Sequence, residues 1–399
     1  MTRQLQDAYI VAATRTPVGK APRGTLKNVR PDELLVHVLR AVLARVPELE
    51  PSLVEDAIVG CAMPEAEQGM NVARVGVLLA GLPNTVGGVT VNRFCASGTT
   101  ALAMAADRIR VGEADVMIAA GTESMSMVPM GGNNPSLSPR IFERDENVGI
   151  AFGMGITAEK VADRWKVSRE DQDAFALASH QKALHAQETG AFADEITPFD
   201  FEERIPDLES GTVSIKNRSL KSDEGPRADT SLAALARLKP AFAVKGSVTA
   251  GNSSQMSDGA GALLLVSERM LKKLNLSPLA RFVSFAVKGV PPEIMGIGPK
   301  EAIPVALAHA GLKLEDLGWI ELNEAFAAQS LAVIRDVGLD PEKVNPLGGA
   351  IALGHPLGAT GAIRAATLIH GLRRTNQRYG MVTMCVGTGM GAAAILERT

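Results

Sequence analysis

The chain has 399 residues, 46% of them hydrophobic, and a formal net charge of −3, so we expect two or three globular domains. This charge argues against a nucleic-acid surface as the main function, and no apolar run is long enough to span a membrane. Three cysteines without C-x-x-C or H-x-x-x-H spacing argue against a disulfide framework and a zinc site. The first residues lack the apolar core of a signal peptide, so we expect a cytoplasmic protein.

Hydrophobic patterning over the first 125 residues predicts alternating strands and helices. The expected strands are residues 8–13, 57–61, 89–92 and 114–120, and the expected helices are residues 31–45, 71–79 and 97–111. This alternation is typical of a sheet covered by helices, and therefore of an α/β fold.

The pattern breaks between residues 126 and 245, where Pro, Asn, Ser and charged residues become frequent. One long helix is expected there, over residues 169–189, because Ser168 suits its N-terminus and Gly190 its C-terminus. We interpret residues 126–245 as an inserted loop domain that covers a site.

The second half of the chain repeats the first. The core pattern resumes near residue 247 with a strand at 262–266, followed by strands at 281–287, 319–322 and 380–385 and by helices at 299–310, within 324–337 and at 358–372. Three positions align at similar offsets of 260, 266 and 262 residues: Cys95 with His355, Gly121 with Gly387, and Cys61 with Asn323. We therefore predict two α/β repeats related by a pseudo-twofold axis. Residues 1–125 and 246–275 would form the N-terminal half and residues 276–399 the C-terminal half.

Cys95 lies in a turn between an expected strand and an expected helix. Unpaired backbone N–H groups and the helix dipole at such a place lower a thiol pKa and can bind an oxyanion. A lone cysteine is more often a small hydrophobic residue, as we expect for Cys61. The turn and the repeat favour a nucleophilic role for Cys95.

If the two repeats face each other, the turns that carry Cys95 and His355 would meet, and two more residues of the second repeat are candidates for chemistry. His355 lies among glycines, and a Cys–His pair is a common source of a thiolate. Cys385 precedes a glycine turn that contains Gly387, and is either a buried strand residue or an acid–base group. Asn323 is either a helix N-cap or the holder of a water or a carbonyl.

Taken together, these motifs resemble the thiolase family. The resemblance rests on five stretches in order, namely the Cys95 turn and residues 251–260, 323–326, 354–356 and 385–389, and it covers essentially the whole chain. It implies a thiolase-like fold with two pseudo-twofold-related halves, and an insertion that covers a coenzyme A (CoA) site.

The resemblance also implies roles for individual residues. Cys95 would carry the acyl group as a thioester, and His355 would activate it and, with a water held by Asn323, stabilise the enolate oxygen. Cys385 would move a proton at C2 of acetyl-CoA, while the N–H groups of Cys95 and Gly387 bind the second oxyanion. Five residues match positions that contact CoA in the family: Met154, Arg227, Phe242, Ser254 and Phe326. The basic stretch from Lys216 to Arg227 either faces the CoA phosphates or is a solvated loop.

Residues 153–159, 223–227 and 251–259 look more like the degradative branch than the biosynthetic branch of the family. We therefore expect thiolytic cleavage of 3-ketoacyl-CoA, with a short-chain acetoacetyl-CoA thiolase (acetyl-CoA acetyltransferase) as the alternative. A thiolase-like lipid carrier and a cysteine hydrolase are more distant alternatives. The resemblance implies that CoA is a co-substrate and that no cofactor or metal is permanently bound. It also implies a homodimer or homotetramer, and association with another enzyme of β-oxidation as a further option.

Overall fold

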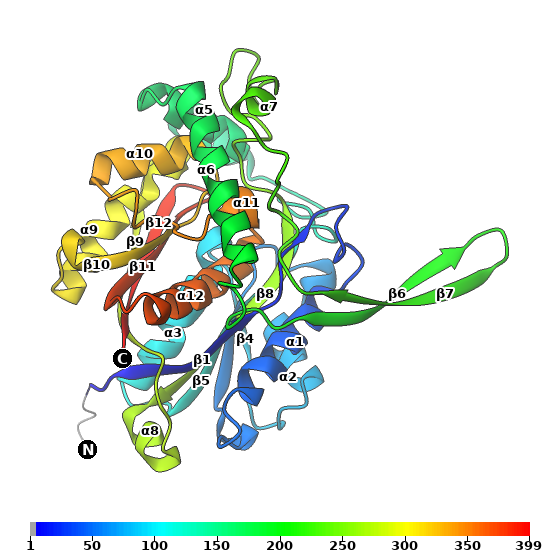
Figure 1. Cartoon of the computed structure of the whole chain (residues 1–399), viewed down its shortest axis with the longest axis vertical. Coiled ribbons are helices and arrows are strands. Elements are labelled where there is room, and N and C mark those ends of the chain that lie inside the picture. The colour runs from blue at the N-terminus through cyan, green and yellow to red at the C-terminus, as the bar shows by residue number, and fades with distance from the viewer. Residues whose placement is uncertain (1–4) are drawn as a thin grey trace.

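A computed structural model describes residues 5–399 of the chain. Its core is a ten-stranded mixed sheet in the order β10-β11-β12-β9-β1-β8-β5-β3-β4, with β2 paired to β8 off this path (Figure 1). The strands are β1 (Ala8–Arg15), β2 (Gly19–Lys20), β3 (Asp56–Gly60), β4 (Val89–Val91), β5 (Val116–Ser124), β8 (Ser257–Ser267), β9 (Ala280–Gly289), β10 (Leu317–Leu322), β11 (Tyr379–Val386) and β12 (Met390–Arg398).

The sheet consists of two halves with the same topology. In the N-terminal half, β3 pairs in parallel with β4 and β5, and β8 lies between β5 and β1 and pairs antiparallel with both. In the C-terminal half, β10 and β11 are parallel, and β12 and β9 follow in antiparallel order. A single parallel bridge between Ile320 and Val344 takes the place of β4. The halves join through β1 and β9, so the predicted α/β fold with a pseudo-twofold repeat is confirmed.

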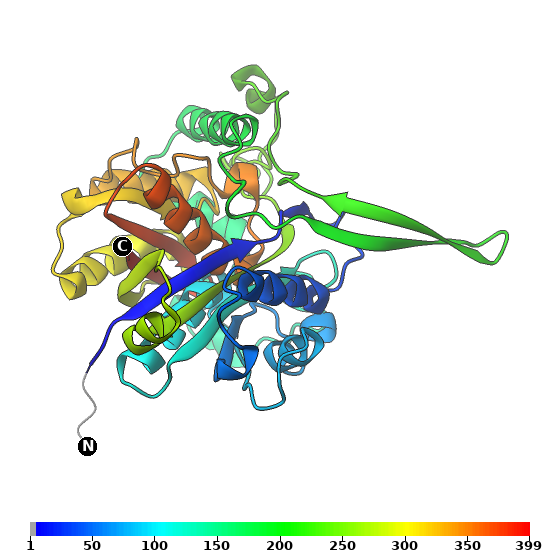
Figure 2. The same cartoon turned by 60° about the horizontal axis from the view of Figure 1, so that its bottom comes forward.

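The helices form three layers around the two sheet halves (Figure 2). The helices outside the insertion are α1 (Pro31–Ala44), α2 (Val72–Leu79), α3 (Ser97–Arg110), α8 (Glu268–Leu274), α9 (Gly298–Ala310), α10 (Ala327–Val337), α11 (Ala350–Leu353) and α12 (Leu357–Arg374). Helices α1 and α2 cover the outer face of the N-terminal half, and α9 and α10 cover that of the C-terminal half. Helices α3 and α12 lie between the halves in a core shared by both. All but three residues of α12 are buried, which explains its Ala- and Gly-rich sequence.

The N-termini of α3 and α12 approach each other backbone to backbone. A Cβ atom on Gly361 would collide with the backbone of Thr99, and one on Gly98 would lie 2.7 Å from the amide nitrogen of Ala362. Residues without a side chain are therefore required here, because backbone atoms of two helices cannot move aside as a flexible side chain can.

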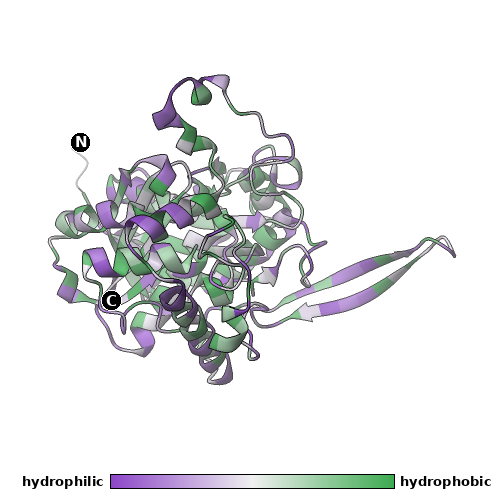
Figure 3. Ribbon diagram, turned by 90° about the horizontal axis from the view of Figure 1, so that it is seen from above, coloured by the Kyte–Doolittle hydropathy of each residue, from purple (hydrophilic) through white to green (hydrophobic). Residues whose placement is uncertain are grey.

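Residues 126–245 contribute no strand to the main sheet within the described residues. They form α4 (Asp145–Val148), α5 (Met154–Arg164), α6 (Arg169–Glu188), α7 (Leu232–Ala236) and a separate hairpin of β6 (Phe199–Asp207) and β7 (Thr212–Leu220). The sequence analysis identified only α6. The hairpin projects from the body, and hydrophilic and hydrophobic residues mix along it (Figures 1 and 3). Strand β6 alternates between partly buried and exposed residues, but β7 is exposed at all but its last residue. Charged residues on both strands weaken the apolar pattern by which strands are recognised.

No helix within residues 5–399 has both the length and the apolar character needed to cross a bilayer.

Replacing Gly361 by Ala tests the close approach of α3 and α12. We expect Gly361→Ala to lower the free energy of unfolding by about 3 kcal/mol, because the new methyl group forces two backbones apart. Denaturant titration followed by circular dichroism measures this change. Gly289→Ala is the control, since its Cβ would meet only an atom at an ordinary 3.8 Å. Equal stability of the two variants would contradict the account.

Candidate active site

Cys95 lies where β4 ends and α3 begins. The chain turns through Phe94, which has a positive φ of 43°, and a single 3₁₀ turn over Phe94–Ala96 leads into the helix. Ser97 fixes the turn, because its hydroxyl donates to the carbonyl of Phe94 (2.7 Å) and accepts from the N–H of Arg93 (2.8 Å). The predicted strand–turn–helix setting of Cys95 is confirmed.

The electrostatics of Cys95 differ from the expectation. Burial raises the pKa of the Cys95 thiol to about 12, although hydrogen bonds from the backbone N–H groups of Gly387 and of Cys95 itself act to lower it. The prediction of a lowered thiol pKa was therefore wrong, because desolvation of the charged form outweighs the helix terminus. The two N–H groups nevertheless point at the sulfur, where an oxyanion attached to an acylated Cys95 would need donors.

Cys385 is the second thiol of the site. It lies near the end of β11, is fully buried, and contacts a cluster that includes Met154 and Phe326. Burial and the neighbouring Cys95 sulfur both raise the pKa of the Cys385 thiol. The chain then turns through Thr388 and Gly389, both with positive φ, and this turn directs the N–H of Gly387 to Cys95. Cys385 and Gly387 therefore lie beside Cys95, in agreement with the roles that the resemblance implies.

His355 is buried between α11 and α12 and forms two side-chain hydrogen bonds. Its Nδ1 lies 2.6 Å from Oγ1 of Thr360, and its Nε2 lies 3.3 Å from Nδ2 of Asn323. With the Asn323 amide donating to Nε2, the proton of the neutral ring lies on Nδ1 and is donated to Thr360. Burial, assisted by the charge of Arg364, lowers the pKa of His355 to about 3. The imidazole is therefore a neutral base with its lone pair on Nε2.

Cys95 and His355 come from equivalent turns, each two residues before the first residue of a central helix. Cys95 also packs against an apolar cluster that contains Leu357, which follows His355 by two residues. The structure thus brings the His355 turn to the Cys95 turn, as the alignment of the repeats predicts. Asn323, at the end of β10, adds a buried Oδ1 that has no hydrogen-bond partner within the described residues and can accept one.

Glu123 is a buried residue that the sequence analysis missed. Its carboxylate accepts hydrogen bonds from the N–H groups of Ala62 and Gly358, both at 2.7 Å, and from the side chain of Gln68. Gly358 lies in the first turn of α12, so this carboxylate joins the N-terminal half to the helix that follows His355. The available indication in the sequence was an acidic residue, between Thr122 and Ser124, directly after the apolar part of an expected strand, β5.

Four of the predicted CoA-contacting residues form a continuous path that begins beside Gly387. The Met154 sulfur would lie 3.8 Å from a Cβ placed on Gly387. Phe242 and Phe326 are in edge-to-face contact with ring centroids 6.0 Å apart, and both lie next to α5. The N–H of Ser254 donates to the carbonyl of Ala325, immediately before Phe326 (2.9 Å).

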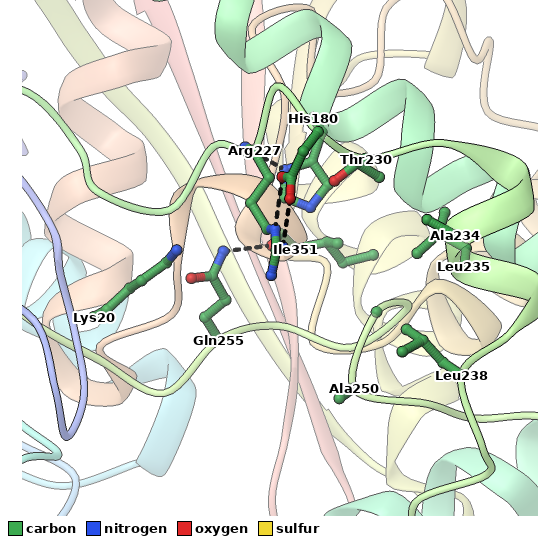
Figure 4. Close-up of a pocket in the computed structure, with 12 residues that line it drawn as sticks. Lys20, His180, Arg227, Thr230, Ala234, Leu235, Leu238, Ala250, Gln255 and Ile351 are labelled. Carbon is green, nitrogen blue, oxygen red and sulfur yellow. Dashed lines mark hydrogen bonds and ion pairs between the residues drawn. The ribbon is translucent and has the colours of Figure 1, made fainter.

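Ser254 is followed in the chain by Gln255, which lines a pocket of about 310 Å³ (Figure 4). It is lined by Lys20, His180, Arg227, Asp229, Thr230, Ala234, Leu235, Leu238, Ala250, Gly251, Gln255 and Ile351. Asp229 binds the Arg227 guanidinium through two oxygens (3.1 and 2.8 Å), and the N–H of Arg227 donates to Nδ1 of His180 (3.2 Å).

The basic stretch predicted from Lys216 to Arg227 does not face this pocket as a unit. Only Arg227 lines it, whereas Lys216 and Arg218 lie on the projecting β7, where Arg218 pairs with Glu203 at 2.8 Å. The second cation of the pocket is Lys20, which the sequence analysis did not identify. The sequence gives little indication that Lys20 lines this pocket, because Lys20 is distant in sequence from the insertion.

No group of three or more His, Cys, Asp or Glu side chains within residues 5–399 is arranged to hold a metal ion. The site instead combines two thiols, a neutral imidazole and two backbone N–H groups. Such a set can form and break a thioester and can move protons without a change of redox state.

Comparison with known proteins agrees with this chemistry. Residues 8–269 match the family described as thiolase, N-terminal domain, and residues 276–398 match thiolase, C-terminal domain. The chain is 51% identical over 394 residues to a 3-ketoacyl-CoA thiolase of Bacillus subtilis (strain 168), with 98% of this chain and all of the relative covered. It is 48% identical over 392 residues to the peroxisomal 3-ketoacyl-CoA thiolase A of Rattus norvegicus, covering 98% of this chain and 88% of that protein.

A solved structure gives the same result. The acetyl-CoA acetyltransferase of Bacillus anthracis superposes with a TM-score of 0.89 at 40% sequence identity, and each chain is covered completely. The two family matches, the relatives and this structure all span essentially the whole chain. The chain therefore belongs to the thiolase family of acyltransferases.

Proposed function

We propose that this protein cleaves 3-ketoacyl-CoA with CoA, giving acetyl-CoA and an acyl-CoA shortened by two carbons, in a reversible reaction of fatty-acid β-oxidation. The observation that carries this proposal is the pair of adjacent thiols, Cys95 and Cys385, beside a His355–Asn323 hydrogen bond. A hydrolase would need one thiol and one base, whereas carbon–carbon cleavage also needs an acid for the departing carbanion.

The first half-reaction makes an acyl-enzyme. The Asn323 amide first turns away from Nε2 of His355, which frees the lone pair of that nitrogen to take the Cys95 proton. The Cys95 sulfur attacks C3 of the substrate, while the N–H groups of Cys95 and Gly387 stabilise the oxyanion. The bond between C2 and C3 then breaks, leaving the shortened acyl group on Cys95. The enolate of acetyl-CoA is stabilised at its oxygen by His355 and a water held by Asn323, and Cys385 gives its proton to C2.

The second half-reaction releases the acyl group. The Cys385 thiolate takes the proton of the incoming CoA thiol, whose sulfur attacks the Cys95 thioester. The bond between the acyl carbon and Cys95 breaks, the departing Cys95 sulfur takes its proton back from His355, and the shortened acyl-CoA is released. The raised pKa values fit this order. Two neighbouring thiolates would repel each other, but acylation makes Cys95 neutral before Cys385 loses its proton.

CoA would enter as a substrate and lie along the path from Cys95 to the pocket. Met154, Phe242 and Phe326 would contact the pantetheine arm, Ser254 would lie beside it, and Arg227 would face the nucleotide end. The face of the Arg227 guanidinium is suited to a planar ring, because Asp229 occupies its edge. Met154, Arg227 and Phe242 all belong to residues 126–245, which supports a covering role for this insertion between the two thiolase halves. No resident cofactor or metal forms part of the proposal.

We also propose a homo-oligomer, either a dimer or a tetramer. Strand β4 is the last strand of the sheet and has one unpaired edge. Apolar side chains lie exposed near it, among them Met70 (95% exposed), Leu78 and Leu79. An exposed edge strand flanked by apolar groups is suited to pairing with a second copy of the chain. The three free cysteines suit a reducing compartment such as the cytoplasm.

Steady-state kinetics tests the function. We expect thiolysis of 3-ketoacyl-CoAs whose acyl chains have from four to sixteen carbons. The value of kcat/KM for chains longer than four carbons should not fall below the value for acetoacetyl-CoA. Activity confined to acetoacetyl-CoA would favour the short-chain alternative suggested by the acetyl-CoA acetyltransferase neighbour. Cys95→Ser should lower kcat by at least ~10³-fold while the protein stays folded. Undiminished thiolysis by Cys95→Ser would overturn the proposal.

The pH dependence of alkylation tests the neutral thiol. Since the pKa of Cys95 is raised above its ordinary value to about 12, the thiolate fraction is small at pH 7 and should grow about tenfold per pH unit up to pH 10. Mass spectrometry of iodoacetamide-treated peptides follows Cys95 alone. An alkylation rate that reaches a plateau below pH 8 would contradict this, because it would indicate a preformed ion pair with His355.

A further inference from the structure

Gln255 joins the pocket near Arg227 to the turn that carries His355. Its side chain lines the pocket, and in Figure 4 it lies between Lys20 and Ile351. Its Nε2 donates to the carbonyl oxygens of Ile351 (3.0 Å) and Ala352 (3.1 Å), in the last turn of α11. These carbonyls would otherwise lack partners at the end of a one-turn helix.

The same residue contacts the catalytic turn through its backbone. The carbonyl of Gln255 accepts hydrogen bonds from the N–H of His355 (3.3 Å) and from the hydroxyl of Ser257 (2.8 Å). The Ser257 hydroxyl in turn accepts from the N–H of His355 (3.1 Å). Gly354 precedes His355 with a φ of +90°, and a Cβ there would collide with Ser257. The position of His355 therefore depends on contacts at residues 255–257.

On its other side, Gln255 holds the loop that carries Arg227. Its Nε2 also donates to the carbonyl of Gly225 (3.1 Å), two residues before Arg227. Gly225 lies so close to the carbonyl of Ala352 that no side chain fits between them. The side-chain amide of Gln255 therefore connects the Arg227 loop to the end of α11. A ligand that orders this loop also affects the end of the helix.

The opposite end of α11 is held independently of the pocket. Glu324, which follows Asn323, accepts from the N–H of Ile351 (3.1 Å) and from Asn345 (2.9 Å). Helix α11 is therefore fixed to β10 at its start and to Gln255 at its end. Of these two anchors, only Gln255 lines the pocket.

We propose that Gln255 is a positioning residue that couples occupation of the pocket by the nucleotide end of CoA to the orientation of His355. This rests on the proposed function, in which that pocket takes the nucleotide. Through Gln255, binding energy from a part of CoA far from the reacting carbons increases the rate of the chemical step as well as the affinity.

A divided substrate tests the coupling. The full-length enzyme is assayed for thiolysis of acetoacetyl-pantetheine by pantetheine, which lack the nucleotide, with and without adenosine 3′,5′-bisphosphate. For the wild type we expect saturating bisphosphate to raise kcat about tenfold. For Gln255→Met, which keeps the size but has no donor, we expect saturating bisphosphate to raise kcat by less than about twofold over the variant's own rate without it.

The matched control is Thr230→Val, which alters the pocket wall without touching α11. It should change the bisphosphate concentration for half-activation but leave the activation at saturation intact. If Gln255→Met does not fold, Gln255→Glu serves in its place, since its carboxylate also cannot donate.

Two outcomes would overturn the coupling: no activation of the wild type by bound bisphosphate, or equal activation of the wild type and Gln255→Met. Failure of the wild type to cleave acetoacetyl-CoA would instead overturn the proposed function, and the two failures are therefore distinguishable.

Discussion

The structure depends on the close contact between the N-termini of α3 and α12. Backbone meets backbone at this point, and a Cβ atom on Gly60, Gly98, Gly121, Gly358 or Gly361 would collide with main-chain atoms from the facing segment. Because Cys95 and His355 lie two residues before the first residues of these helices, the same contact that packs the core sets the distance between them. The reactive groups are thus held by rigid elements and not by surface loops.

The position of these groups has an electrostatic consequence, because Cys385 and His355 are buried and Cys95 is half-buried. Burial raises the pKa of both thiols and lowers that of the imidazole, so the groups are neutral before substrate binds. Charge then appears only as bonds form, where the N–H groups of Cys95 and Gly387 are already oriented to receive it. The arrangement favours proton transfer at the same time as carbon–carbon and carbon–sulfur bonds form or break. It disfavours a thiolate–imidazolium ion pair that exists before the substrate binds.

Much of this could be predicted from the sequence, because the core elements follow strong periodic patterns and the two halves repeat. The alignment of Cys95 with His355 needed only the order of strands, turns and helices, and the structure brings these turns together. The projecting hairpin was missed because β7 is exposed on both faces and because charged residues interrupt the apolar alternation of β6. The thiol pKa was mispredicted because local sequence reveals the helix terminus but not the burial around it. Glu123, Gln255 and Lys20 act through partners distant in sequence, which no local pattern reports.

The central claim is that the two thiols have separate tasks, with Cys95 carrying the acyl group and Cys385 moving the proton. It is tested most directly by treating Cys385→Ser with acetyl-CoA, trapping the protein in acid, and locating the acetyl group by peptide mass spectrometry while assaying acetoacetyl-CoA formation. The account predicts an acetyl group on Cys95 and no carbon–carbon bond formation. An unacetylated Cys95, or an acetylated variant that still forms acetoacetyl-CoA at the wild-type rate, would contradict it.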